Sequence, residues 1–187
     1  MFTRILASFP SGFFDANAAV VTNTEFVYFV KPLRNHGWRA ALASSHELEA
    51  VLLQMKAKRW THPSTLVASI SVPPLRHIIP RAIYAQTLVN QAIIACALER
   101  YRIEHGSYPD SLAPVTLADG KPLPVDILTE LPMGYRKTVN GKYALWCVSL
   151  NGTDHDGARV LDQEHPEKTK FRDETYDGDW VWDFPEK

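Results

Sequence analysis

The sequence lacks an apolar run long enough to cross a membrane. Its longest apolar stretch, residues 92–98, is far shorter than the roughly eighteen residues that a membrane helix needs. The N-terminus, MFTRILASFPSGFF, also lacks the sustained apolar core and the small-residue cleavage site of a signal peptide. Taken alone, the chain is therefore expected to be soluble, with no membrane span. If it is part of a longer chain, we expect an extracytoplasmic or cell-envelope location.

Cysteine is scarce, and so is net charge. The 187 residues include two cysteines, Cys96 and Cys147, and carry a formal net charge of −1. Neither cysteine has another metal-ligating residue at short spacing, which disfavours a metal site at these residues. Both lie in apolar runs, so we expect either two buried thiols or one disulfide. The near-neutral charge offers no basic face for nucleic acid, and no nucleic-acid partner is expected.

Recognisable catalytic motifs are also missing. The chain has no G-x-S-x-G elbow, no P-loop and no G-x-G-x-x-G turn. His46-Glu47 begins like a zinc-protease motif, but Ala50 stands where the second histidine is needed. Asp154-His155-Asp156 could orient a base, although no nucleophile lies nearby in the sequence. We therefore predict that the protein is not an enzyme, and a metal-dependent hydrolase is a distant alternative.

What the sequence does contain is a helical N-terminal region, predicted over residues 1–74. Residues 13–30 form an apolar-rich helix, which Pro32 and the Asn35-His36-Gly37 turn should interrupt. Ser44 and Glu47 have the spacing of a capping box, so a second helix is predicted to begin at Ser44 and to end in basic residues near Arg59. A third, short helix is predicted over residues 64–72.

A second domain is predicted over residues 75–187, beginning with a long helix over 75–104. Gly106 stands where a glycine commonly ends a helix. The sequence predicts one broad apolar side for this helix, which should be buried. That side comprises Ile83, Leu88, Ile94, Ala95, Leu98 and Tyr101.

Proline-rich sequence follows, and then a predicted antiparallel sheet. A short helix is predicted over residues 111–115. Residues 135–139 and 142–149 flank Asn140-Gly141, which predicts a hairpin with a type I′ turn. The alternation in residues 180–184 predicts a further strand, after a long polar loop over 152–178. The fold class is therefore α+β, with the long helix packed on a small antiparallel sheet.

Three motifs in the C-terminal half resemble the globular domain of the type II secretion major pseudopilin. ACALERYRIEHGSYPDSLAPV (95–115) resembles that family's helix end and the Gly-x-Tyr-Pro turn after it. YALWCVSLNGTDHDG (143–157) resembles its strand and following loop, and DGDWVW (177–182) its closing strand. The resemblance implies an α/β roll without catalysis. The chain departs from the family in lacking the prepilin cleavage motif and the hydrophobic N-terminal helix, so the roll is expected to serve as a borrowed scaffold.

The resemblance also implies a possible calcium ion, held by the acidic loop after the second strand. From Ser149 onward, eleven acidic residues stand against five basic ones, which gives this part a net charge of −6. Calcium takes six to eight oxygen ligands, whereas the alternative is a set of solvated turn residues. The candidate ligands are the carboxylates of Asp154, Asp156, Asp177 and Asp179, with the carbonyls of Leu150 and Thr153.

These observations predict a structural or assembly module of a secretion- or envelope-related bacterial protein, with protein partners. The alternative is a ligand-binding module. Its surface would be either the calcium-ordered loop or a sheet face bearing Trp146, Trp180 and Trp182, although alternating tryptophans more often form core. An assembly module should expose an apolar helical face, whereas a binding module should expose tryptophan in a concave patch.

Overall fold

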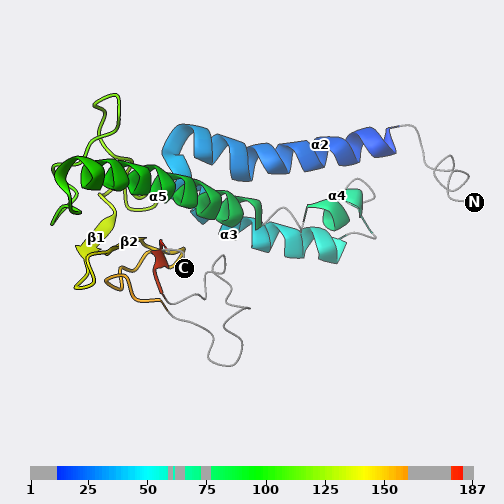
Figure 1. Cartoon of the computed structure of the whole chain (residues 1–187). Coiled ribbons are helices and arrows are strands. Elements are labelled where there is room, and N and C mark those ends of the chain that lie inside the picture. The colour runs from blue at the N-terminus through cyan, green and yellow to red at the C-terminus, as the bar shows by residue number, and fades with distance from the viewer. Residues whose placement is uncertain (1–11, 59–60, 62–65, 73–76, 160–177, 183–187) are drawn as a thin grey trace, which may run out of the picture. The chain divides into compact units, whose positions relative to one another are not determined.

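The computed structural model describes residues 12–58, 61, 66–72, 77–159 and 178–182 (Figure 1). None of the helices in these ranges is both long and apolar enough to span a bilayer. The chain divides into two compact units, residues 1–79 and 80–187. The sequence placed this boundary between residues 74 and 75, so the observed division falls five residues later, within the first turn of the long helix.

The N-terminal unit is helical. It comprises α2 (Phe13–Glu25), a π-helical turn η1 (Phe26–Val30), α3 (Lys31–Lys58) and the short α4 (Leu66–Ser71). The chain runs out along α2 and returns along α3, and α4 contacts both of them (Figure 1). Within α3, Gly37 leaves the helical conformation, with φ 79° and ψ −170°. This is the interruption predicted at Asn35-His36-Gly37, at a backbone conformation that favours glycine. The interruption predicted at Pro32 is wrong, because Pro32 lies in the first turn of α3, where its missing N–H is tolerated.

The predicted helix start at Ser44 is wrong. Helix continues from Trp38 straight through Ser44 to Lys58, because the intervening WRAALA segment consists largely of good helix formers. The Ser45 hydroxyl donates to the Leu42 carbonyl at 2.7 Å, the usual bond of a serine inside a helix rather than at a cap. The predicted basic C-terminus is confirmed by Lys56 and Lys58 in the last turn.

The second unit is built on α5 (Ile78–His105). Pro80 is tolerated because it lies in the first turn, where its missing N–H is not needed. At the other end the Gly106 N–H donates to the Arg102 carbonyl at 2.8 Å, and Gly106 has φ 80°. Glycine therefore ends the helix as predicted.

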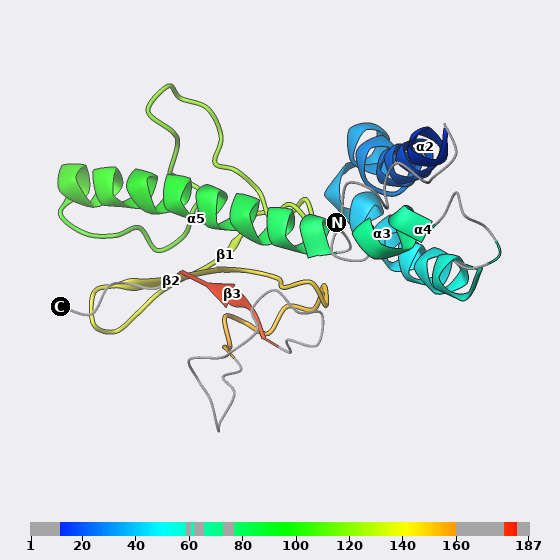
Figure 2. The same ribbon diagram turned by 90° about the vertical axis from the view of Figure 1, so that its right-hand side faces the viewer.

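A three-stranded antiparallel sheet completes this unit, and the predicted α+β class is confirmed. Its strands are β1 (Gly134–Lys137), β2 (Tyr143–Cys147) and β3 (Trp180–Val181), in the order β1-β2-β3. Cys147 pairs with Trp180 across β2 and β3. Helix α5 lies along one face of the sheet (Figure 2). The predicted strand over 180–184 is thus observed for its first two residues, and residues 183 and 184 lie outside the described part.

The hairpin between β1 and β2 is confirmed, but its turn type is not. A type I′ turn needs positive φ at two central residues, and in this turn only Gly141 has it, at 69°. The Gly141 N–H donates to the Thr138 carbonyl at 3.1 Å, and the Thr138 N–H donates to the Lys142 carbonyl at 2.9 Å. This is a three-residue loop, with glycine in the left-handed position after a tight turn.

The proline-rich segment between α5 and β1 contains turns instead of the predicted helix over 111–115. Its only regular feature there is a turn closed by the Val115 N–H on the Leu112 carbonyl at 3.0 Å. Pro114 has no N–H to contribute to a helical turn, which explains the difference.

Asp126 anchors the end of this segment to the sheet. Its buried Oδ1 accepts the N–H groups of Leu128 and Thr129 at 2.8 and 3.2 Å, and its Oδ2 accepts the N–H of Val148 at 2.9 Å. Three N–H donors offset the cost of burying a carboxylate. No local sequence signal identifies this residue, because its partner Val148, just after β2, lies 22 positions away.

Candidate functional site

The acidic residues predicted to converge do so in part. Asp154 and Asp156 lie in the loop after β2, and Asp179 immediately precedes β3. Because β2 and β3 are antiparallel, the end of one strand lies beside the start of the other. We call residues 149–159 together with Asp179 the acidic edge. Asp177 lies outside the described residues.

Asp179 holds the loop of the acidic edge through backbone hydrogen bonds. Its Oδ2 accepts the N–H groups of His155 and Gly157 at 3.0 and 2.8 Å, and its own N–H donates to the Ala158 carbonyl at 2.8 Å. The His155 Nδ1 lies 3.7 Å from Oδ1. The side chain is fully buried. Burial raises the pKa of Asp179 above its ordinary value, although the two N–H donors act in the opposite direction.

Asp154 has a similar role on the other side of the loop. Its Oδ1 accepts the indole N–H of Trp146 at 3.0 Å and the backbone N–H of Asp156 at 2.9 Å. Asp156 itself is exposed, with φ 56°. A Cβ at Gly157 would lie only 3.0 Å from the Trp146 ring, so the loop passes close over the indole. Asp154 therefore fixes both a turn and a core tryptophan.

These contacts bear on the calcium hypothesis without deciding it. The Leu150 side chain is buried, and the Thr153 N–H donates to the Asn151 Oδ1 at 2.9 Å. Across the described residues, no three His, Cys, Asp or Glu side chains lie together in a way that could hold a metal ion. Hydrogen bonds account for the arrangement of the acidic edge as it stands, which favours the alternative interpretation of these acids as turn residues, and a calcium titration tests the two interpretations.

Two of the three tryptophans proposed for a binding face belong to the core. Trp146 and Trp180 are buried, and Trp146 is so close to Gly134 that a Cβ there would overlap its ring. Trp180 packs edge-on against Tyr84 of α5, with ring centroids 5.2 Å apart. Trp182 is half-buried and lines a pocket of about 240 Å³. Only Trp182 thus remains accessible for the binding face that the sequence suggested.

The two cysteines have different environments and are not joined in a disulfide. Cys147 is a buried free thiol, which confirms the first of the two alternatives for this residue. Burial raises the pKa of its thiol. The Gln91 Nε2 lies 3.8 Å from its sulfur. Cys96 is exposed on α5, so the prediction of a buried thiol is wrong for this residue. An exposed and a buried thiol differ strongly in accessibility to reagents.

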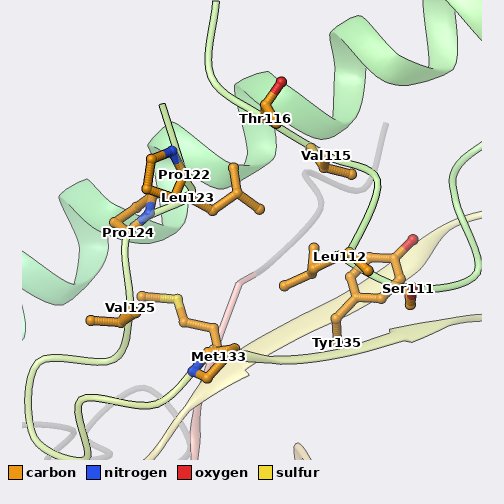
Figure 3. A pocket seen from close by; sticks show the side chains of 12 residues that line it. Ser111, Leu112, Val115, Thr116, Pro122, Leu123, Pro124, Val125, Met133 and Tyr135 are labelled. Carbon is orange, nitrogen blue, oxygen red and sulfur yellow. The ribbon is translucent and has the colours of Figure 1, made fainter. Parts of the chain in front are cut away.

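An apolar pocket that the sequence analysis missed lies beneath the proline-rich segment (Figure 3). Its volume is about 630 Å³. Leu112 and Leu123 reach it from the segment, and Met133 and Tyr135 from the start of β1 (Figure 3). Of the described residues that line it, Tyr135 alone has an ionisable side chain, and its hydroxyl donates to the Pro109 carbonyl at 2.7 Å. The pocket therefore offers apolar surface rather than converging reactive groups.

A more polar pocket of about 570 Å³ lies between the end of α5 and residues 114–118. Arg100, Glu104 and His105 line it. The Arg100 Nη2 donates to the Thr116 carbonyl at 2.8 Å, and the His105 ring stacks on Tyr101 with centroids 4.0 Å apart. The hydrogen bond from Arg100 holds the loop against the helix, whereas the stack lies within α5.

Tyr108, in the Gly-x-Tyr-Pro turn of the resemblance, folds back onto α5. Its hydroxyl donates to Glu99, whose other oxygen accepts the Arg102 Nε at 2.9 Å. The Tyr108 ring packs edge-on against Tyr143 of β2 at 4.9 Å. Burial is the main cause that raises the pKa of Tyr108. The turn therefore serves to join helix and sheet.

The predicted apolar side of α5 is buried at Ile83, Ile94, Ala95 and Leu98, but polar residues of the middle turns are buried beside them. Toward the rest of its unit the helix buries Thr87, Asn90 and Gln91, with 2%, 8% and 0% exposed. The Gln91 Nε2 donates to the Trp180 carbonyl at 2.5 Å, and the Asn90 Nδ2 donates to the Val125 carbonyl at 3.3 Å. Hydrogen bonds therefore hold this part of the helix to the sheet and to the proline-rich segment.

The other side of the helix is apolar and accessible. Leu88, Val89 and Ile93 are 38%, 52% and 38% exposed. The predicted burial of Leu88 is therefore wrong, because hydrogen-bonded polar residues occupy the inner side at this level. No charged residue occurs from position 82 to position 98. We call this side the outward face of α5; it comprises Ala82, Ala85, Leu88, Val89, Ala92, Ile93 and Cys96.

No protein-family model matches the chain, and neither a curated protein nor a solved structure shows significant similarity to it.

Proposed function

We propose that this chain is a non-enzymatic assembly module of a secretion- or envelope-related bacterial protein, and that the outward face of α5 docks against another protein. The observation that carries the proposal is the exposure of apolar side chains on α5 opposite its buried side. A helix at a water-exposed surface normally presents polar side chains outward. Here the polar residues of the central turns point inward, and apolar ones remain exposed over several turns.

The physical gain from covering this face is substantial. Fully burying a valine, leucine or isoleucine side chain contributes about 1.5–3 kcal/mol. Leu88, Val89 and Ile93 are between a third and a half exposed, so covering them would contribute on the order of 3 kcal/mol before the costs of association. Contiguous exposed apolar residues of this kind commonly mark interaction sites.

The link to secretion or the envelope is supported by the resemblance of the three C-terminal motifs. A helix packed on a small antiparallel sheet is also the arrangement that the resemblance implies. The helical N-terminal unit adds further exposed apolar side chains on α2 and η1, among them Phe14, Phe26 and Val30. A module with such surfaces on separate helices suits assembly better than catalysis.

Site-specific photo-crosslinking tests the proposal. A photoreactive residue would replace Val89 on the outward face, and a matched control would carry it at the fully exposed Val139 of the hairpin loop. In the native cells, we expect discrete protein adducts from position 89, identifiable by mass spectrometry, and none of the same products from position 139. No adduct at position 89, or the same products at both positions, would overturn the proposal.

A further inference from the structure

A small pocket adjoins the outward face of α5, between this helix and β3. Its volume is about 240 Å³. This exceeds the cavity of roughly 150 Å³ that holds benzene, and it is less than the roughly 300 Å³ at which pockets for drug-sized ligands begin. The pocket therefore accommodates one ring or one large side chain. The residues that line it and bear on its chemistry are Tyr84, Leu88, Gln91, Arg159, Trp180 and Trp182, of which Leu88 also belongs to the outward face.

Gln91 contributes a hydrogen-bond acceptor to this pocket. Its side chain is fully buried, and its Nε2 donates to the Trp180 carbonyl at 2.5 Å. Since a carbonyl oxygen can only accept, the NH₂ group of the amide must face β3, and this fixes the orientation of the amide. No residue in the described part of the chain donates to the Gln91 Oε1, which is buried. A buried acceptor without a donor is unfavourable, so a ligand that brings an N–H or O–H to it gains affinity.

Aromatic side chains form much of the pocket wall. Tyr84 and Trp180 pack edge-on with ring centroids 5.2 Å apart, so each ring is held in place by the other. Trp182, which is half-buried, lines the same pocket. Aromatic rings make favourable edge-on or offset contacts with other rings, beyond the gain from burial alone. The wall therefore favours an aromatic ring over an aliphatic side chain of the same size.

The charge of the pocket narrows the choice of ligand further. Arg159 alone is charged among the lining residues that the structure describes, and its Nη2 donates to the Val181 carbonyl at 2.7 Å. This guanidinium disfavours a cationic ligand. A carboxylate can only accept hydrogen bonds, so it would leave the Gln91 oxygen without a donor. An arginine does, however, pack favourably against the face of a neutral aromatic ring.

We infer that the pocket receives a tyrosine or tryptophan side chain of a partner protein, whose O–H or N–H donates to the Gln91 Oε1. This rests on the proposed docking of another protein on the outward face of α5, and it names the kind of residue that anchors that protein. Tyrosine and tryptophan are large aromatic residues that carry a donor, whereas phenylalanine has none. They also contribute much of the binding energy in many interfaces, where they fill pockets surrounded by less critical contacts. The outward face beside the pocket would supply those contacts.

Small aromatic probes test the pocket directly, in NMR titrations of the full chain. Indole and benzothiophene have nearly the same shape, but benzothiophene lacks the N–H. We expect indole to bind about fivefold more tightly than benzothiophene, and p-cresol about fivefold more tightly than toluene, because one member of each pair has a donor. Glucose, which has donors but no aromatic ring, should not bind at the same concentrations. Equal affinities within each pair, as when a water molecule already satisfies the Gln91 oxygen, would overturn the inference.

Two variants locate the binding of these probes. Trp182→Ala removes part of the pocket wall at a half-buried position and should weaken indole binding about tenfold. Gln91→Met removes the acceptor at similar volume and should abolish the preference for indole over benzothiophene. Val139→Ala, in the exposed hairpin loop, is the matched control and should leave both affinities unchanged. Circular dichroism checks the folding of each variant, and unchanged indole binding in folded Trp182→Ala would place the probe elsewhere and overturn the inference even if Gln91→Met does not fold.

Photo-crosslinking distinguishes failure of this inference from failure of the proposed function. Trp182→Ala, added to the chain that carries the photoreactive residue at position 89, should lower the yield of protein adducts about fivefold, whereas Val139→Ala should not. Adducts that persist unchanged in Trp182→Ala would exclude the pocket as an anchor but leave the docking face in place. Indole binding without any adduct from position 89 would mean that the pocket takes a free aromatic compound, and the proposed docking of a protein would fail.

Discussion

The acidic edge and the outward face of α5 differ in how well the sequence predicted their roles. The acidic edge carries the residues that suggest a functional site, and in the structure those residues hold the protein together: Asp179 and Asp154 accept backbone and indole N–H groups. The apolar sequence of the outward face of α5 suggests that it is buried, yet its side chains are accessible. A functional surface is better sought where side chains have no structural task that explains them.

The largest expected effect is at the acidic edge. Asp179→Ala leaves the N–H groups of His155 and Gly157 without their acceptor inside the protein, and each unsatisfied buried group costs about 1–3 kcal/mol. We expect the free energy of unfolding to fall by about 2–4 kcal/mol in chemical denaturation. Asp156→Asn is the control, since Asp156 is exposed and asparagine tolerates its positive φ. Equal losses of unfolding free energy in the two variants would contradict the structural role assigned to Asp179.

The pH dependence of stability sharpens this assignment. Burial raises the pKa of Asp179 in the folded state above its ordinary value of 3.8. The unfolded chain therefore releases this proton at a lower pH than the folded protein, so the contribution of Asp179 is complete below pH 3.8 and declines as pH rises through the folded pKa. Relative to Asp179→Asn, the unfolding free energy of the unmodified chain should fall as pH rises above about 4. If the unfolding free energy of the unmodified chain instead rises with pH relative to that of Asp179→Asn, the raised pKa is contradicted.

A smaller effect is expected from polar substitution on the outward face. Val89→Gln changes a half-exposed side chain with no hydrogen-bond partner to lose, and it should alter the unfolding free energy of the monomer by less than about 0.5 kcal/mol. Ile94→Gln is the matched change on the buried side of the same helix, and it should cost about 2–5 kcal/mol. Thermal and chemical unfolding at low protein concentration would measure both. A large loss from Val89→Gln would mean that the residue packs within its own chain.

The smallest expected effect is that of calcium. The carboxylates of Asp154 and Asp179 already accept N–H donors that hold the loop, so we expect millimolar calcium to shift the thermal midpoint by less than about 1 °C relative to excess chelator. A rise of several degrees that is lost in Asp154→Ala would instead support the calcium-ordered loop. It would also show that the acidic edge binds a ligand, which would break the contrast with α5.

Local sequence was sufficient for much of the fold. The helix over residues 13–30, the end of α5 at Gly106 and the hairpin between β1 and β2 were predicted, because each depends on periodicity or on a turn residue within a few positions. The predictions at Ser44 and at the hairpin turn were wrong for the same reason. Each prediction relied on one local signal, and the flanking residues carried a competing signal.

The sequence by itself determined the helical N-terminal region, the long helix α5 with its uncharged stretch, and the antiparallel sheet. The buried side of that stretch was predicted through Ile83, Ile94 and Leu98, but only the tertiary structure showed that polar residues are buried beside them. Gln91 donates to a carbonyl on β3, 89 positions away, and Asp126 accepts the N–H of Val148, just after β2, at a distance of 22 positions. Once these polar groups are placed inside, helical geometry turns Val89, Ile93 and Cys96 outward. Periodicity predicts which side of a helix is apolar, but long-range hydrogen bonds decide which polar residues are buried with it.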